Sequence, residues 1–138
     1  MIVATTGEMR VVRLVDGEAL MDSLLTLKLD SGIILGGVGM LRDLEVAYWN
    51  GSAYEAHPIA EPVELLSLQG NFARSDAGPV VHAHAAVACR DGKVLGGHVV
   101  AATVHNTVEI AIHTLAGITL DRRPEPSGLV GLFPRVEG

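Results

Sequence analysis

Residues 80–104 read VVHAHAAVACRDGKVLGGHVVAATV, and this stretch decides the fold because it describes two strands joined by a turn. Apolar and small residues lie on both sides of Asp91-Gly92, a pair that strongly favours a two-residue turn between antiparallel strands. We therefore expect a β-hairpin with one strand over 80–90 and the other over 93–104.

Three histidines lie on this hairpin: His82, His84 and His98. Side chains two residues apart on a strand project from the same face, so His82 and His84 share one face. A third imidazole from the neighbouring strand would complete a three-nitrogen site of the kind that holds zinc with a fourth position open. The pattern therefore predicts a metal site for zinc or another divalent transition metal.

The register of the hairpin decides whether His98 reaches that face. With a two-residue turn at Asp91-Gly92, a regular ladder places His98 opposite Ala85, on the wrong face. One extra residue on the second strand would move His98 opposite His84. We expect a bulge at Gly96-Gly97, because glycine tolerates the positive φ that a bulge can require; the alternative is a different strand arrangement.

Upstream of the hairpin, one segment is typical of an amphipathic helix of about a dozen residues. Asp16 is placed as its N-cap, Glu18 lies in the first turn, Lys28 in the last turn, and Gly32 is expected to end it. Its apolar stripe consists of Leu20, Met21, Leu24, Leu25 and Leu27.

Most of the remaining chain predicts β-strands, expected over 9–14, 33–40, 44–49, 53–57, 63–72, 107–115 and 118–121. Asn50-Gly51 is a second hairpin signal, and the tail from Pro124 is expected to be extended along the surface or toward a neighbour. Hairpin-connected strands with one early helix predict an α+β fold, a largely antiparallel β-sheet packed against one main amphipathic helix. With 138 residues and no linker or repeat, residues 1–138 are expected to form a single domain.

Composition and charge limit the possible functions. Hydrophobic residues make up 49% of the chain, more than one small core can bury, which favours a homo-oligomer. The net charge of −6 disfavours direct binding to DNA, and Arg122-Arg123-Pro124 is too short to form a basic patch. The single cysteine, Cys89, is expected to be a small buried thiol, and with no signal peptide or membrane span in the sequence we expect a soluble cytoplasmic protein.

Two carboxylates interrupt apolar runs that we expect to be largely buried. Glu109 lies within 107–112 and Glu64 within 62–68, and a buried carboxylate needs a partner such as a cation or the N–H of a metal ligand. Both are therefore candidate catalytic residues. His105 and His113 are expected on a polar, solvent-facing side of the 107–115 strand, and His57 in a loop.

The sequence resembles the PPC family, the plant-and-prokaryote-conserved domain, over nearly its whole length. The resemblance lies in RLVDGE at 13–18, ILGGVGML at 34–41, ELLSLQG at 64–70, VHAH at 81–84, DGKVLGGH at 91–98 and TVEI at 107–110. It implies one α+β domain that assembles as a homotrimer, with His82, His84 and His98 as metal ligands in prokaryotic members. The fold is also similar to that of acetolactate decarboxylase, a zinc enzyme with a three-histidine site.

In plants the domain accompanies AT-hook DNA-binding motifs and mediates assembly with itself and with transcription factors. This chain lacks the Arg-Gly-Arg-Pro core of such motifs. Three functions remain open. The first is a metal-binding trimer whose open position receives water or a small ligand, with Glu109 or Glu64 orienting that ligand or handling a proton. The second is an assembly module that binds a protein partner without catalysis, or more weakly DNA. The third is a metal-dependent lyase or hydrolase acting on a small oxygenated acid.

Overall fold

The 80–104 stretch forms the predicted hairpin, built from β6 (Gly78–Ala88) and the first part of β7 (Val94–Thr114). The computed structural model describes residues 1–138 as nine strands and one helix. The other elements are β1 (Ile2–Thr6), β2 (Met9–Val15), α1 (Leu20–Leu25), β3 (Gly32–Trp49), β4 (Tyr54–Ile59), β5 (Val63–Ser75), β8 (Ile118–Pro124) and β9 (Val130–Val136).

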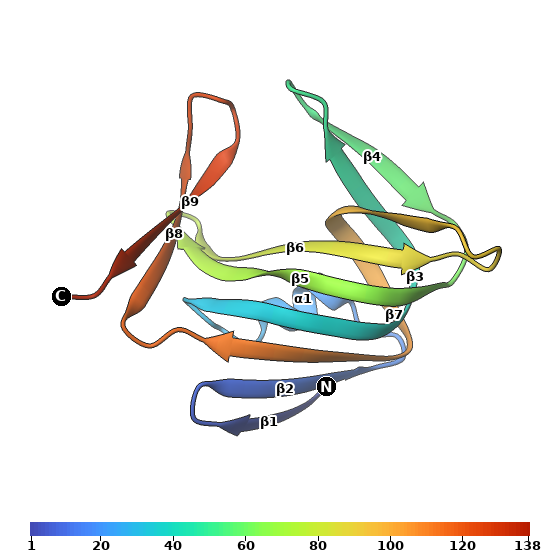
Figure 1. Ribbon diagram of the computed structural model, residues 1–138, viewed down its shortest axis with the longest axis horizontal. Helices are drawn as coiled ribbons and strands as arrows, with labels where there is room; N and C mark the ends of the chain where they lie inside the picture. The colour runs from blue at the N-terminus through green and yellow to red at the C-terminus, as the bar shows by residue number, and fades with distance from the viewer.

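Strand β7 organises the sheet because it pairs with three others, β2, β3 and β6. The pairing runs from β7 through β3, β5 and β6 and then returns to β7, so these four strands form a closed circuit. Every strand pairing is antiparallel except a single contact between β5 and β8. The predicted largely antiparallel sheet is therefore confirmed, and Figure 1 shows its strands stacked in front of α1.

The helix is shorter than the sequence pattern predicts. It covers six residues, begins after Ala19, and buries Leu20 and Leu24 against the sheet, where α1 packs on β6 and β7. These two leucines belong to a hydrophobic cluster of 23 buried residues that fills the space between helix and strands. The expected packing of one apolar helix face on the sheet is thus confirmed, although the helix has fewer than two turns.

The predicted caps of the helix are wrong. The Asp16 carboxylate accepts a hydrogen bond from the Asn106 backbone N–H at 2.9 Å and another from Arg42 Nη1 at 3.0 Å, so it ties the chain to β7 and β3. Lys28 has the left-handed conformation, with φ of 51°, and Gly32 is already the first residue of β3. Tertiary contacts of the flanking residues therefore override the local capping signals.

Several predicted strand boundaries are also wrong. Predicted strands 33–40 and 44–49 are one strand, β3, and the second hairpin strand continues through Asn106 to Thr114 as β7. Asp43 and Asn106, which lie between the predicted strands, adopt positive φ and are accommodated within β3 and β7. Strands β1 and β9 were not predicted; β9 formed from the expected extended tail and pairs with β8.

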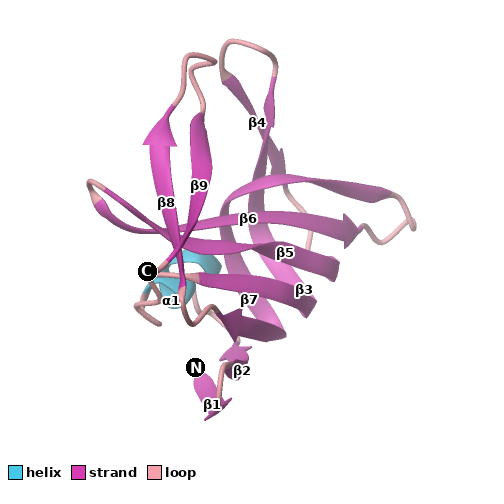
Figure 2. Ribbon diagram, turned by 60° about the vertical axis from the view of Figure 1, so that its left-hand side comes forward, coloured by secondary structure: helices cyan, strands magenta, loops and turns pink.

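Two hairpins project from the sheet on the same side of the molecule, as Figure 2 shows for β8–β9 and for β4 with the end of β3. The Asn50-Gly51 signal marks a longer loop over 50–53, in which Asn50 Oδ1 accepts hydrogen bonds from the N–H groups of Ser52 and Ala53. A β-carbon added at Gly128, in the β8–β9 loop, would lie 3.8 Å from the Trp49 ring, so the two hairpins approach each other. No helix in the structure has the length and apolarity needed to cross a bilayer.

Candidate metal centre

The β6–β7 register places His98 directly opposite His84, as the metal hypothesis requires. The extra residue that sets this register lies in the turn and not at the diglycine. Cys89 N–H donates to Lys93 O at 2.9 Å, so the loop contains Arg90, Asp91 and Gly92, the last with φ of 82°. The two-residue turn predicted at Asp91-Gly92 is wrong, because a left-handed glycine closes a three-residue turn and shifts the strand by one position.

Gly96 and Gly97 do not form the predicted bulge; they allow neighbouring strands to pack closely. The ladder from Ala88–Val94 to His84–His98 contains no register shift. A β-carbon at Gly96 would overlap the Ala85 carbonyl oxygen, and one at Gly97 would lie 3.0 Å from the Ala47 carbonyl oxygen. Glycine at these positions lets β7 pass closely between β6 and β3, which brings His98 to the point where both strands pair with β7.

The three imidazoles converge on one point. His82, His84 and His98 each offer a ring nitrogen, and these nitrogens lie within 4.8 Å of one another. Ring centroids are 5.0 Å apart for His82 and His84, 4.9 Å for His82 and His98, and 5.5 Å for His84 and His98. No other group of three or more histidine, cysteine or carboxylate side chains converges in this way, and no carboxylate belongs to this one.

The surroundings favour the uncharged form of His82 and His98. Burial, the positive charge of Arg122 and the other two imidazoles together lower the pKa of His82 to about 4. The pKa of His98 is also lowered, first by burial and then by His84 and Arg122. Neutral imidazole is the form that binds metal ions.

One unsatisfied atom supports the same interpretation. His98 Nδ1 is buried and has no hydrogen-bond partner within the chain, which is uncommon for a buried polar atom. A metal ion or a bound ligand would satisfy such a nitrogen. Three imidazole donors with no fourth protein ligand fit a divalent transition metal with an open coordination position.

Several residues around the histidines carry little signal in the sequence, because they are far from the histidines along the chain. Tyr54 stacks on His98 with ring centroids 5.0 Å apart, and Asn71 and Gln69 of β5 lie directly opposite His82 and His84. Arg122 of β8 donates from Nη2 to Asn71 Oδ1 at 2.9 Å. The only sequence signal for Arg122 was the short Arg122-Arg123 pair, and strand alternation sends these two side chains to opposite faces.

The two candidate carboxylates lie outside the histidine cluster. Glu109 is exposed and pairs with Val38 of β3 and Arg13 of β2, while Glu64 is exposed and pairs with Met40 of β3. The expectation that they are buried is wrong, because the strands alternate and their apolar neighbours, such as Val108, face the core instead. Their catalytic role stays a prediction, without support from the geometry of a single chain.

The remaining candidate residues do not belong to the histidine cluster. His105 lies 3.8 Å from Asp16, and His113 lies 3.6 Å from Glu8, both measured from ring nitrogen to carboxylate oxygen. His57 is in β4 and not in a loop. Cys89 is a free, partly buried thiol that packs against the core, so the expectation of a fully buried one is only partly met.

Comparison with known proteins identifies the family. Residues 1–116 match the model of the Plants and Prokaryotes Conserved (PCC) domain, and the chain belongs to this family. A plant- and prokaryote-conserved (PPC) protein from Pyrococcus horikoshii superposes with a TM-score of 0.83 at 30% identity, over 94% of this chain and 92% of that chain.

Two further solved structures have the same fold. A metal-containing protein from Archaeoglobus fulgidus superposes with a TM-score of 0.80 at 26% identity, over 96% of this chain and 99% of that chain. A candidate DNA-binding protein from Ralstonia eutropha superposes with a TM-score of 0.87 over 95% of this chain and 94% of that chain, and at 21% identity this likeness shows the fold alone.

A curated relative is much longer than this chain. The bifunctional protein GlmU of a Synechococcus strain is 29% identical over 129 residues, which are 88% of this chain and 20% of that protein. The chain therefore spans about a fifth of the curated relative that it matches.

Proposed function

We propose that this protein is a metal-binding homotrimer in which His82, His84 and His98 hold a divalent transition metal, with zinc as the expected ion, and leave one coordination position open for a small ligand. The observation that carries the proposal is the convergence of three ring nitrogens within 4.8 Å of one another, from two strands and with no carboxylate among them. Such a set is typical of zinc sites that exchange a ligand.

Three further observations support the metal. The pKa of His82 is lowered to about 4, so protons do not compete for its ring nitrogen near neutral pH. His98 Nδ1 is buried and lacks a partner in the chain. The relative from Archaeoglobus fulgidus, at 26% identity, is described as metal-containing.

Metal analysis of the purified protein tests this proposal. We expect about one divalent ion per chain after zinc loading and desalting, and loss of that ion when His82 and His84 are both replaced by alanine. His105→Ala is the matched control, because His105 lies on β7 like His98 but near Asp16. A metal content that the double replacement leaves unchanged would rule out this site.

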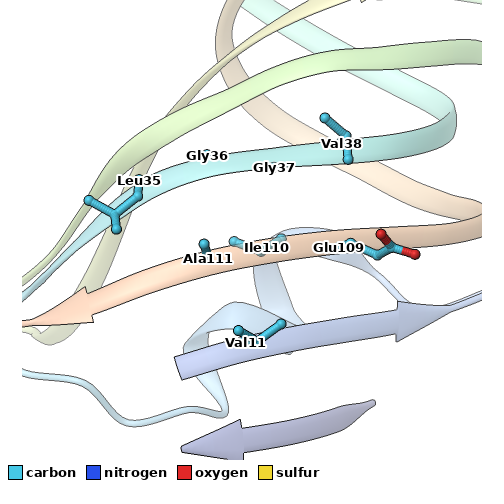
Figure 3. Close-up of a pocket in the computed structure, with 8 residues that line it drawn as sticks. All are labelled: Val11, Leu35, Gly36, Gly37, Val38, Glu109, Ile110 and Ala111. Carbon is cyan, nitrogen blue, oxygen red and sulfur yellow. The ribbon is translucent and has the colours of Figure 1, made fainter. Parts of the chain in front are cut away.

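The trimer is proposed from an apolar depression on the outer face of β2, β3 and β7, shown in Figure 3. Val11, Leu35 and Val38 line it and are 56%, 49% and 52% exposed, although they are large apolar side chains. Contiguous exposed apolar surface of this kind marks a protein contact. We expect a mass of three times 14.5 kDa by light scattering, and dissociation of the Val38→Glu variant, with Val136→Glu as the control.

The other two functions have less support. An assembly module without catalysis would use the same apolar face, and the fold alone links this chain to candidate DNA-binding proteins, while its net charge of −6 opposes contact with phosphates. A lyase or hydrolase needs a proton-handling group beside the metal. Within one chain, neither Glu64 nor Glu109 belongs to the histidine cluster.

A further inference from the structure

The charges around the histidine cluster do not balance. Imidazole ligands carry no charge when they bind a metal, so a divalent ion would keep its full charge here. The guanidinium of Arg122, bonded to Asn71 opposite His82, adds one more positive charge nearby. No aspartate or glutamate belongs to the cluster, and Arg122 forms no ion pair, whereas its neighbour Arg123 pairs with Asp121 at 3.2 Å. A partly buried group of positive charges without a counter-ion is unfavourable, so a loaded site would attract an anion.

The guanidinium of Arg122 is held on the histidine face of the sheet. Its Nη2 donates to Asn71 Oδ1 at 2.9 Å, and Asn71 lies directly opposite His82, so both side chains project from the same face. Its Nη1 donates to the Val130 carbonyl oxygen at 3.1 Å, which anchors the group from β9. Two strands therefore fix the position of this cation beside the imidazoles.

Arg122 still has donors to offer. A guanidinium carries five N–H groups in a planar fork, and only two of them are used in these contacts. Arg122 Nε is buried and has no partner in the chain. A buried cationic donor without an acceptor is costly, and a ligand oxygen would relieve that cost.

An aromatic ring also borders the histidine cluster. Tyr54 of β4 stacks on His98 with ring centroids 5.0 Å apart.

We propose, resting on the metal site above, that the open position receives the carboxylate of a small molecule, with one carboxylate oxygen on the metal and Arg122 donating to the carboxylate group. A carboxylate has two oxygens, so one can bind the metal while the other accepts hydrogen bonds from the guanidinium of Arg122. A phosphate brings further oxygens, and no lysine and no glycine-rich phosphate loop accompanies Arg122 at this site. The structure therefore favours a carboxylate over a phosphate.

The experiment uses cobalt(II) in place of zinc, because the visible absorption of cobalt reports its ligands. Cobalt-loaded protein is titrated with acetate and, separately, with inorganic phosphate at constant ionic strength. We expect a saturable spectral change with acetate at lower concentration than with phosphate. Arg122→Gln should weaken acetate binding at least about ten-fold, the loss expected for a charge-assisted hydrogen bond, and still bind cobalt.

Arg123→Gln is the matched control, because Arg123 is adjacent in sequence but contacts Asp121 and the Phe133 ring. It should bind acetate as the unmodified protein does. Arg122→Lys keeps the charge without the fork, should weaken acetate binding less than Arg122→Gln, and provides the test if Arg122→Gln does not fold.

The outcomes separate the two proposals. Failure of the unmodified protein to bind cobalt would overturn the metal site and the ligand site together. Cobalt binding with equal acetate affinity in the unmodified protein and in the folded Arg122 variants would overturn the ligand site alone. Tighter binding of phosphate than of acetate would overturn the assignment to a carboxylate.

Discussion

The two ends of β7 carry histidines with opposite surroundings. At the beginning of the strand, His98 meets His82 and His84 with no carboxylate among them. Further along the strand, His105 and His113 each lie near one carboxylate, from Asp16 and Glu8, with ring nitrogens 3.8 Å and 3.6 Å from the carboxylate oxygens. One strand thus holds the same residue type in two chemical settings.

The difference concerns the groups around each ring. Near His105 and His113 a carboxylate lies within ion-pair distance of a ring nitrogen, and at His105 the Nη1 of Arg42 also lies 3.3 Å from Nδ1. At His82 and His98, burial, Arg122 and the neighbouring imidazoles favour the neutral ring, which keeps a lone pair for a metal. Residue type and strand position therefore do not identify a ligand histidine; the groups around its ring do.

Removing one imidazole at each end of β7 should have the largest effect on this contrast. We expect zinc at about 100 times its Kd to stabilise the unmodified protein by about 2.7 kcal/mol, because the ion binds the folded state. His98→Ala should abolish this stabilisation, and His113→Ala should keep it. Thermal unfolding with and without zinc measures both, and a zinc effect that survives His98→Ala would remove the distinction between the ends.

The cluster of His82, His84 and His98 can also be disturbed without replacing a histidine. A β-carbon at Gly70 would overlap the His82 carbonyl oxygen and approach Ala83 Cα, so Gly70→Ala must push β6 away from β5. We expect a loss of about 1–3 kcal/mol in unfolding free energy, as for overpacking, together with weaker zinc binding. Urea unfolding and zinc titration measure the two effects.

Gly138→Ala is the control for this substitution. Gly138 is the last residue of the chain, away from the histidine cluster and from the apolar depression, and a β-carbon added there meets nothing within 4 Å. It should change stability by less than about 0.5 kcal/mol and leave zinc affinity unchanged. Equal effects of the two substitutions would show that the close packing of Gly70 on the His82 backbone does not position the zinc ligands.

A further expected effect is on the pH dependence of stability without metal. The pKa of His82 is about 4 in the folded chain against an ordinary value of 6.5, so between these values the unfolded chain binds more protons than the folded chain. Lowering the pH from 6.5 toward 4 should therefore reduce the unfolding free energy, by at most roughly 1.4 kcal/mol per pH unit.

Chemical unfolding across this pH range measures the slope, after the metal has been removed by a chelator. His82→Gln should reduce the slope, since it removes one of the two histidines, with His98, whose pKa is lowered in the folded chain. His113→Gln at the other end of β7 is the comparison and should retain the slope. An unchanged slope in His82→Gln would mean that His82 is protonated as readily in the folded chain as in the unfolded one.

Local patterns predicted much of this molecule. The β6–β7 hairpin, the antiparallel sheet and the buried leucines of α1 follow from residue alternation and spacing, which depend only on neighbours along the chain. The helix caps failed because Asp16 found partners on distant strands, Asn106 and Arg42. The exposure of Glu109 was missed because two-residue alternation was read as a continuous buried run.

The sequence by itself determined that three histidines occupy one hairpin and that His82 and His84 share a face, because side-chain direction on a strand alternates residue by residue. Only the tertiary structure decided that His98 joins them, since one left-handed residue, Gly92, sets the register of a whole strand. It also decided that Arg122 and Asn71 stand beside the imidazoles, because strand pairing joins residues whose separation along the chain no local pattern records.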